Sequence, residues 1–269
     1  MTQATRQPTI YLPHGGGPCF FMEWTMGPRD TWDRMADWLR SLPGSLPATP
    51  SALLVVSGHW ETPVPSVTTA AKPPLLYDYS GFPRSTYELQ WPAPGSPELA
   101  ARVQQLLGGA GIATRADGAR GFDHGVFIPL KVAYPEPRIP TVQLSLRAGL
   151  DPVEHLAIGR ALAPLRDEGV LIVGSGMSYH NMRGFMAPDT RDVSARFDEW
   201  LAAAVAAPPG ERDAALAGWS RAPMARQSHP REEHLLPLMV VAGAAGADRG
   251  KQVLRDEVMG AVVSAFRFE

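Results

Sequence analysis

The ten residues ALLVVSGHWE, from Ala52 to Glu61, indicate the fold class of this chain. The first five are all apolar and form an uninterrupted run, which is typical of a strand buried on both faces of a parallel sheet. Ser57 and Gly58 end the run, and His59 follows at its carboxyl end. Open α/β sheets bind their ligands at the carboxyl ends of parallel strands. The stretch therefore predicts a buried strand that presents a histidine to a ligand crevice.

Two other stretches share this pattern. Residues 10–12 favour a strand, and Pro13 with the glycines at 15–17 must end it, so His14 lies at a strand's carboxyl end. Residues 170–173 (VLIV) predict another buried strand, and the following segment GSGMSYHN contains His180. Because glycine has no Cβ, these loops allow a ligand to approach the backbone closely. The three stretches together predict several histidines at one edge of a sheet.

The rest of the chain alternates between helix and strand patterns. Helices are expected at 27–41, 96–107, 152–166, 193–206 and 211–218, and further strands at 64–70, 112–115 and 139–144. We expect an ordered loop at 72–87 that could form a pocket wall, an apolar segment to residue 245, and a hairpin or edge-strand pair at 253–268. The sequence predicts one α/β domain over residues 1–269, with a central, mostly parallel sheet flanked by helices and an active site at the strand carboxyl ends.

Composition excludes several classes of protein. The chain has 269 residues, of which 45% are hydrophobic and 19% charged, as in a folded globular protein with a sizeable core. A net charge of −2 provides no general field for nucleic acid or an anionic membrane, so neither is an expected partner. The first ten residues hold no apolar secretion signal, and no run approaches the ~20 apolar residues of a membrane span. We therefore expect a cytoplasmic protein, either a monomer or a small homo-oligomer.

A metal site in this chain would need histidine or carboxylate ligands, because the sequence has a single cysteine. Three neutral imidazoles would hold a divalent metal and leave coordination positions open for a substrate, as a catalytic site requires. Five of the seven histidines lie in glycine-flanked or acidic contexts at expected element ends, namely His14, His59, His124, His180 and His234. His155, within a predicted helix, and His229, in a polar loop, are expected to be exposed.

Nearby carboxylates and serines leave alternatives open. Glu61 and Glu233, each beside one of these histidines, would complete a ligand set of two histidines and one carboxylate. Asp123 is expected to support the neighbouring His124 by orienting its ring. A serine hydrolase is disfavoured, because the sequence has no Gly-x-Ser-x-Gly motif.

The chain resembles the class III, or LigB-type, extradiol ring-cleavage dioxygenases, and most closely their DOPA extradiol dioxygenase branch. Five segments carry the resemblance, in the family's order. They are PHGGGP at 13–18, SGHWE at 57–61, FDHG at 122–125, GSG at 174–176 continuing to HN at 180–181, and EHLLPL at 233–238. They span nearly the whole chain.

The resemblance implies that His14, His59 and His234 hold a metal. It implies that His180 is the acid/base histidine, which in some metal-bound relatives also lies close enough to be a ligand. His124 matches a second pocket histidine that helps to place O₂ or substrate. Relatives that cleave protocatechuate have a glutamate at the position of His234, so a neutral ligand here leaves the metal open between iron(II), expected for activity, and zinc(II).

The implied reaction cleaves the ring of a catechol, DOPA-like or otherwise substituted, with O₂ to give a semialdehyde acid. Arg183 and Asp123 are candidate contacts for the substrate, although no cluster of arginines marks a carboxylate pocket. Two alternatives use the same ligands: a zinc hydrolase with His180 as proton shuttle, and a non-catalytic metal-binding protein. The second is disfavoured because metal binding alone needs neither His124 nor His180.

Overall fold

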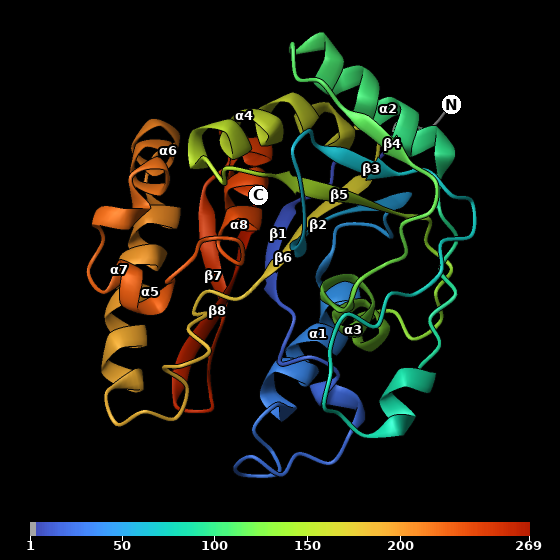
Figure 1. Ribbon diagram of the computed structural model, residues 1–269. Helices are drawn as coiled ribbons and strands as arrows, with labels where there is room; N and C mark the ends of the chain where they lie inside the picture. The colour runs from blue at the N-terminus through green and yellow to red at the C-terminus, as the bar shows by residue number, and fades with distance from the viewer. Residues whose placement is uncertain (1–3) are drawn as a thin grey trace.

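The computed structural model describes residues 4–269, and within them the strands form one eight-stranded sheet (Figure 1). Its spatial order is β4-β3-β5-β2-β6-β1-β8-β7. The strands are β1 (Thr9–Pro13), β2 (Ala52–Thr62), β3 (Ser66–Thr68), β4 (Arg115–Asp117), β5 (Thr141–Arg147), β6 (Val170–Gly176), β7 (Gly250–Val258) and β8 (Ala261–Phe268). The expected α/β class with a mostly parallel sheet is confirmed.

The four central strands, β5, β2, β6 and β1, are parallel to one another, whereas β3 pairs antiparallel with β5 and β8 pairs antiparallel with β1. The apolar run that opens β2 is buried on both faces of the sheet. Leu54 and Val56 belong to the core on one face, and Leu53 and Val55 to the core on the other. Full burial of each such side chain contributes roughly 1.5–3 kcal/mol, which explains why this run is apolar without alternation.

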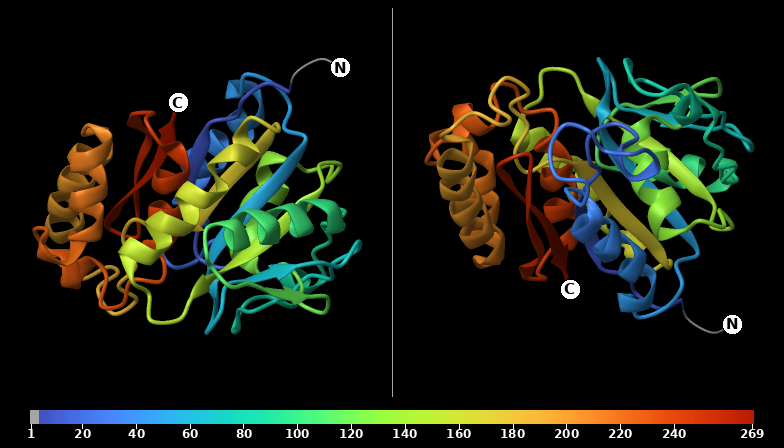
Figure 2. Two further views of the ribbon diagram at one scale, coloured as in Figure 1. Left: turned by 90° about the horizontal axis from the view of Figure 1, so that it is seen from above. Right: turned by 90° about the horizontal axis from the view of Figure 1, so that it is seen from below.

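Helices cover both faces of the sheet. The α-helices are α1 (Asp33–Ser45), α2 (Pro97–Gly109), α3 (His124–Ala133), α4 (Pro152–Leu162), α5 (Thr190–Ala206), α6 (Pro209–Ala217), α7 (Ala225–Ser228) and α8 (Leu236–Ala245). One core contains residues of α2, α4, α5 and α8, and the opposite core contains residues of α1 and α3. Figure 2 shows α2 and α4 over one face, and α1 and α3 over the other. Helix α5 packs on the β7–β8 hairpin.

The β7–β8 pair confirms the expected hairpin at the end of the chain. A two-residue turn, Met259 and Gly260, joins the strands, and both residues have positive φ (51° and 79°), as a type I′ turn requires. Because β8 pairs with β1, this turn lies on the same side of the molecule as the loop after β1. Met259 consequently reaches the candidate site described below.

Several element boundaries differ from the expectations. Helix α1 begins at residue 33 rather than 27, and β4 lies at 115–117 rather than 112–115. Residues 124–133, which the sequence shows only as a mostly apolar segment, form helix α3. Nine of its ten residues are buried, so it carries no polar face that would reveal a helical period.

Among the described residues, the search for a helix long and apolar enough to span a bilayer finds none.

Candidate metal centre and active site

The register of three parallel strands brings two of the predicted histidines together. In the sheet β6 lies between β1 and β2, and Ser175 of β6 is opposite both Leu12 and Ser57. His14 lies two residues after Leu12, and His59 lies two residues after Ser57. Both histidines therefore project from the same edge of the sheet. The pairing of β2 with β5 shifts register between residues 56 and 61, around His59. The crevice expected at the strand carboxyl ends is thus where these histidines lie.

His234 joins them from the loop before α8. Its backbone oxygen accepts hydrogen bonds from the Tyr11 hydroxyl (2.7 Å) and the Met177 amide (3.2 Å). A Cβ on Gly176 would lie 2.0 Å from the same oxygen, so only glycine allows the end of β6 to approach this loop. The sheet therefore fixes the position of His234, although the residue is remote in sequence from β1 and β6.

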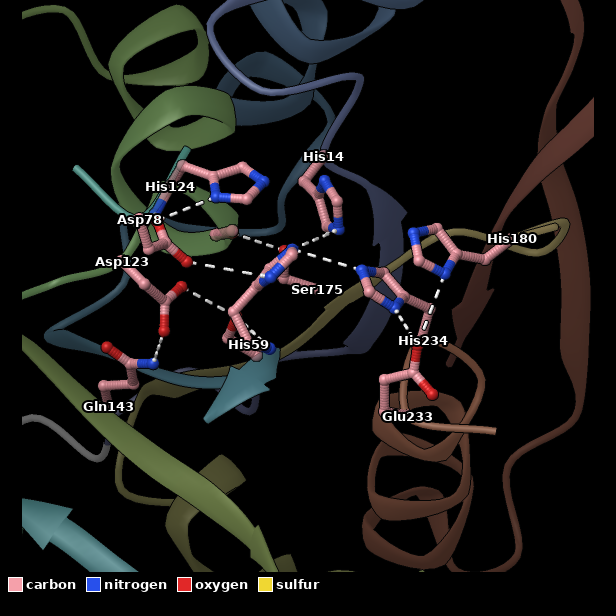
Figure 3. Close-up of polar contacts among 12 residues, drawn as sticks. His14, His59, Asp78, Asp123, His124, Gln143, Ser175, His180, Glu233 and His234 are labelled. Atoms are coloured by element: carbon pink, nitrogen blue, oxygen red, sulfur yellow. Dashed lines mark hydrogen bonds and ion pairs between the residues drawn. The ribbon is translucent and has the colours of Figure 1, made fainter. Parts of the chain in front are cut away.

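The three rings present their Nε2 atoms to one another (Figure 3). His59 Nε2 lies 3.2 Å from His14 Nε2 and 3.1 Å from His234 Nε2. Nitrogens bound to one ion at about 2.0–2.1 Å, with angles between octahedral and tetrahedral, lie roughly 2.9–3.4 Å apart. The observed spacing therefore fits three ligands of one transition metal.

The tautomers support the same conclusion. His14 Nδ1 lies 2.8 Å from the Gly15 carbonyl oxygen, and His234 Nδ1 lies 3.0 Å from a carboxylate oxygen of Glu233. Each Nδ1–H can donate to its oxygen, which leaves the Nε2 of that ring without a proton. Converging lone pairs repel one another unless a cation lies between them. This donor set is therefore suited to a divalent metal.

The electrostatic surroundings keep these rings neutral. Burial lowers the pKa of His14 and of His59 well below the ordinary value, and the neighbouring histidines lower both further. Burial and His180 lower the pKa of His234 to about 4, against the opposing effect of Glu233. Metal ligation requires unprotonated imidazole, so the site is prepared to bind a metal at neutral pH.

Asp78 positions His124, the first residue of α3. One oxygen of Asp78 accepts from both the backbone amide of His124 (2.9 Å) and its Nδ1–H (2.8 Å), and the other lies 3.7 Å from His59 Nδ1. Burial would raise the pKa of Asp78, but its hydrogen bonds with His124 outweigh burial and lower it. Figure 3 shows the other nitrogen of the His124 ring directed toward His14. An anionic Asp78 therefore fixes both the tautomer and the direction of this ring.

The side chain of Asp123 does not bond to the His124 ring, as was expected from the sequence, but to other residues. Its side chain is fully buried and accepts hydrogen bonds from Ser57 (2.8 Å), Gln143 and Arg120 (3.1 Å). Burial and the charge of Asp78 raise its pKa. The expected orienting bond to His124 is made by Asp78 instead. Asp123 ties the end of β2 to α3 and β5, and it is not among the residues that line the cavity.

His180 stacks on His234, with ring centroids 3.4 Å apart and ring planes at 18°. Its Nδ1 lies 3.3 Å from the Glu233 carboxylate, and Figure 3 shows its other nitrogen directed away from that carboxylate. Burial would raise the pKa of Glu233, but hydrogen bonds from His180 and His234 hold it well below the ordinary value. Glu233 therefore supports two neighbouring rings as an anion.

A cavity of ≈ 300 Å³ opens beside these histidines. His14, His59, His124 and His180 line it, together with Gly15 to Gly17, whose lack of side chains leaves space next to the metal-ligand candidates. Gly15 has φ +85°, and a Cβ there would lie 2.5 Å from the Cys19 sulfur. The expected wall from the 72–87 loop is present, because Tyr79, Ser80 and Phe82 also line the cavity.

Other predicted residues lie elsewhere. Glu61 pairs with Arg231. Arg183 is exposed and does not line the cavity, so its role as a substrate contact stays a prediction. The expectation that His155 and His229 are exposed is wrong, because both are fully buried. His155 accepts from the Arg147 amide and bonds the Asp151 carbonyl, whereas His229 donates to the Ser178 carbonyl and thereby anchors the loop that carries His180.

Sequence patterns did not single out Asp78. It lies in the irregular loop 72–87, and its contact with His124 spans 46 residues. The prolines and aromatic residues of this loop predict a pocket wall, but nothing in the local sequence distinguishes Asp78 from an ordinary loop aspartate.

Comparisons with known proteins find a family of dioxygenases. Residues 8–267 match the family described as the catalytic LigB subunit of aromatic ring-opening dioxygenase. The chain is 42% identical to a 4,5-DOPA dioxygenase extradiol of Beta vulgaris over 220 residues, which are 80% of this chain and 81% of that protein. It is 37% identical to the dioxygenase tasH of Hapsidospora irregularis, over 94% of this chain and 82% of that protein.

A solved structure shows the same fold. The crystal structure of an uncharacterized protein from Escherichia coli K12 superposes with a TM-score of 0.78 at 31% identity, covering 98% of this chain and all of that chain.

Proposed function

The chain belongs to the LigB family of aromatic ring-opening dioxygenases, and from that premise we propose that it cleaves the ring of a catechol with O₂ at a divalent metal held by His14, His59 and His234. The observation that carries this proposal is the convergence of three Nε2 atoms, 3.1–3.2 Å apart in successive pairs, beside a cavity that His14 and His59 line. The expected enzyme class, a ring-cleavage dioxygenase, agrees with the family.

Iron(II) is the metal proposed for turnover. A redox-active divalent metal in this position supplies the Lewis acidity and the electron transfer that ring cleavage by O₂ requires. Three neutral ligands add no negative charge, and zinc(II) fits the same nitrogen donors. Zinc is therefore the natural competitor for the site and a useful inactive control.

His180 is proposed as the base that takes a proton from a catechol hydroxyl. Its Nδ1–H points to the Glu233 carboxylate, so the opposite nitrogen is free to accept a proton from a group in the cavity. Glu233 then stabilises the imidazolium that forms, as a carboxylate does in other histidine-based acid/base pairs. The same ring can return the proton when the ring-opened product forms.

His124 is proposed to place O₂ or a catechol oxygen from the other side of the cavity. Asp78 keeps its Nδ1 protonated, and the remaining nitrogen faces His14 across 5.2 Å between ring centroids. The rings of His59 and His124 lie closer still, at 3.9 Å. A polar group bound next to the three ligand candidates would thus contact His124 on one side and His180 on the other.

Gly15 to Gly17 leave room for a planar ring. The aromatic bond that breaks is proposed to lie beside the two hydroxyls, and both oxygen atoms of O₂ enter the semialdehyde acid that forms. The backbone amide of His14 donates a hydrogen bond to the Gly176 carbonyl (3.1 Å), which holds His14 at the end of a strand. The catechol ring would therefore be oriented against a rigid strand end.

The test is oxygen uptake by protein reconstituted anaerobically with iron(II), against a panel of catechols, with zinc-loaded protein as control. We expect uptake that matches the appearance of a yellow semialdehyde, with iron and not with zinc. Turnover of esters or amides by the zinc form, with no oxygen uptake by the iron form, would instead favour a hydrolase. A filled metal site without either activity would favour a metal-binding protein.

A further inference from the structure

We propose that the substrate is a catechol whose ring substituent is uncharged and apolar, such as an alkyl or aryl group, rather than the amino-acid side chain of DOPA. This inference rests on the proposed function and concerns the part of the cavity beyond the histidines. It depends on the composition of that wall, on the pairing of nearby charges and on the residues at the cavity mouth.

Apart from the histidines, the cavity lining is mainly apolar. Trp24, Trp32, Phe82, Met177, Phe185 and Met259 belong to it, and Ser80 and Tyr79 contribute hydroxyl groups. Within the described part of the chain, the residues that line the cavity include no lysine, arginine, asparagine or glutamine, and the histidines are their only ionisable groups apart from the Tyr79 phenol. Burial raises the pKa of that phenol to about 12, so it is neutral at physiological pH. A carboxylate on the substrate would find no cation on this wall, and an unpaired buried charge is strongly unfavourable.

Cations near the site are already paired. Arg120 donates to Asp123 and to the His59 carbonyl, and it is not among the residues that line the cavity. Arg231 pairs with Glu61 and with Glu233. Arg183 is exposed and lies outside the lining. Neutralising a substrate carboxylate would therefore require breaking an existing ion pair or moving Arg183.

An ammonium group on the substrate would also lack a charged partner in the cavity lining. Asp78 is bonded to His124, and Glu233 to His180 and His234, and neither carboxylate lines the cavity. The aromatic faces of Trp24 and Trp32 offer a weaker cation–π contact, but these two rings pack edge-to-face on each other at 5.3 Å. The wall can therefore bind a substituent through dispersion and burial, but not through a charged contact.

The mouth of the cavity extends this apolar surface. Met26 and Met182 line the cavity and are 46% and 71% exposed. Met26 and Met259 also border an adjoining hollow of ≈ 350 Å³ with Met186, which is 60% exposed. Arg191 lines this hollow too, and it is paired with Glu257. Exposed apolar patches of this kind commonly mark ligand grooves, and methionine adapts to ligands of varied shape. The arrangement suits a substituent of several carbons that packs against these methionines.

Three catechols of matched size test the proposal: 4-propylcatechol, its anionic analogue 3-(3,4-dihydroxyphenyl)propanoate, and the cation dopamine, with L-DOPA as a fourth. With iron-loaded protein we expect kcat/KM for 4-propylcatechol to exceed that for each charged catechol by about tenfold or more. A preference for L-DOPA, for the anion or for dopamine would overturn the inference while supporting ring cleavage.

Binding to zinc-loaded protein, measured by calorimetry, decides the question even if turnover fails. The neutral catechol should bind about tenfold more tightly than the charged ones, because its substituent needs no partner on the wall. Equal or weaker binding of 4-propylcatechol would overturn the inference whatever the oxygen uptake shows. Absence of turnover with every catechol, together with this binding preference, would overturn the proposed function alone.

Met182→Arg tests the wall directly, because it places a cation at the cavity mouth on an exposed residue. We expect the ratio of kcat/KM between the neutral and anionic catechols to fall by about tenfold. Val153→Arg is the matched control, since Val153 is 55% exposed on α4 and does not line the cavity. If the ratio does not change in Met182→Arg, or if Arg183→Ala selectively abolishes turnover of the anion, the inference is wrong.

Discussion

The two halves of the cavity differ in how their side chains are held. On the histidine side, His14, His124 and His234 each have a ring nitrogen within 3.0 Å of an oxygen, and the backbones of His14 and His234 bond to strand residues. On the apolar side, Met182 and Met26 are 71% and 46% exposed, and the ring nitrogens of Trp24 and Trp32 have no hydrogen-bond partner among the described residues.

The difference separates chemistry from specificity. Reacting groups must be held to within a fraction of an ångström, which strand ends and paired hydrogen bonds provide. A wall that selects a substituent by burial can use loops and flexible methionines, because dispersion has little directional preference. Substitutions on the histidine side should therefore abolish the reaction, whereas those on the apolar side should change which catechol reacts.

Removing a ligand should have the largest effect. His59→Ala deletes the ring whose Nε2 contacts both other ligand candidates, so metal affinity should fall by more than about 100-fold and turnover should be lost. Metal content after dialysis and oxygen uptake measure this. His155→Gln is the control, because that histidine is buried away from the cavity; it should lower stability but retain the metal. Full metal occupancy in His59→Ala would contradict the assignment.

Removing the proposed base should separate chemistry from binding. His180→Ala should retain the metal and lose turnover by about 10²–10⁴-fold, with partial rescue by added imidazole. Glu233→Gln keeps the ring but removes the anion beside it, and turnover should fall by about 10–100-fold. Turnover of His180→Ala equal to that of the parent would remove the acid/base role, and loss of the metal would show that His180 is a ligand.

Weakening the support of His124 should have a smaller effect. Asp78→Asn removes the charge that fixes the His124 tautomer, so kcat should fall by about 10–100-fold with unchanged metal content. Asp37→Asn, on the exposed face of α1, is the matched control and should leave kcat unaltered. An unchanged pH profile of kcat in Asp78→Asn would argue that this carboxylate has a structural role only.

The smallest predicted effect concerns stability. Burial lowers the pKa of His229 from its ordinary 6.5 to about 3, so this ring is neutral when folded and takes up a proton on unfolding. Its contribution to stability is present above pH 6.5 and is lost progressively as the pH falls toward 3. His229→Gln should retain the bond to the Ser178 carbonyl but not titrate. Between pH 6 and 4, the free energy of unfolding of the parent should fall more steeply, by about 1.4 kcal/mol per pH unit. Equal slopes in denaturant titrations of the two apo-proteins would contradict this.

The sequence predicts the strand ends and the histidines that follow them, because apolar runs followed by glycine and histidine are local patterns. His124 and His234 precede apolar segments, and they are predicted from their glycine or acidic neighbours and from the family resemblance. Helix α3 could not be recognised, since it is buried almost all round and lacks an amphipathic period. The burial of His155 and His229 is likewise not evident from the local sequence. His155 follows Glu154, and His229 lies between Ser228 and Pro230, yet both side chains are fully buried. The rings of Phe197 and Trp219, which lie elsewhere in the chain, pack against His229.

The partners of the site residues could not be predicted either. Asp123 is adjacent to His124 in sequence, yet Asp78 makes the contact, because residue 123 precedes the first turn of α3 and its side chain points back to Ser57 and Gln143. Local order identifies which residues can do chemistry. The hydrogen-bond partners of those residues are determined by how the loops pack against the strand ends.

The most direct test of the central claim is to turn over a catechol with ¹⁸O₂ and iron-loaded protein, and to determine the label in the product by mass spectrometry. The account predicts a ring-opened semialdehyde acid in which both atoms of one O₂ are found, and no such product from zinc-loaded protein. An unlabelled quinone with hydrogen peroxide, or a ring-opened product whose carboxylate carries no label, would contradict it.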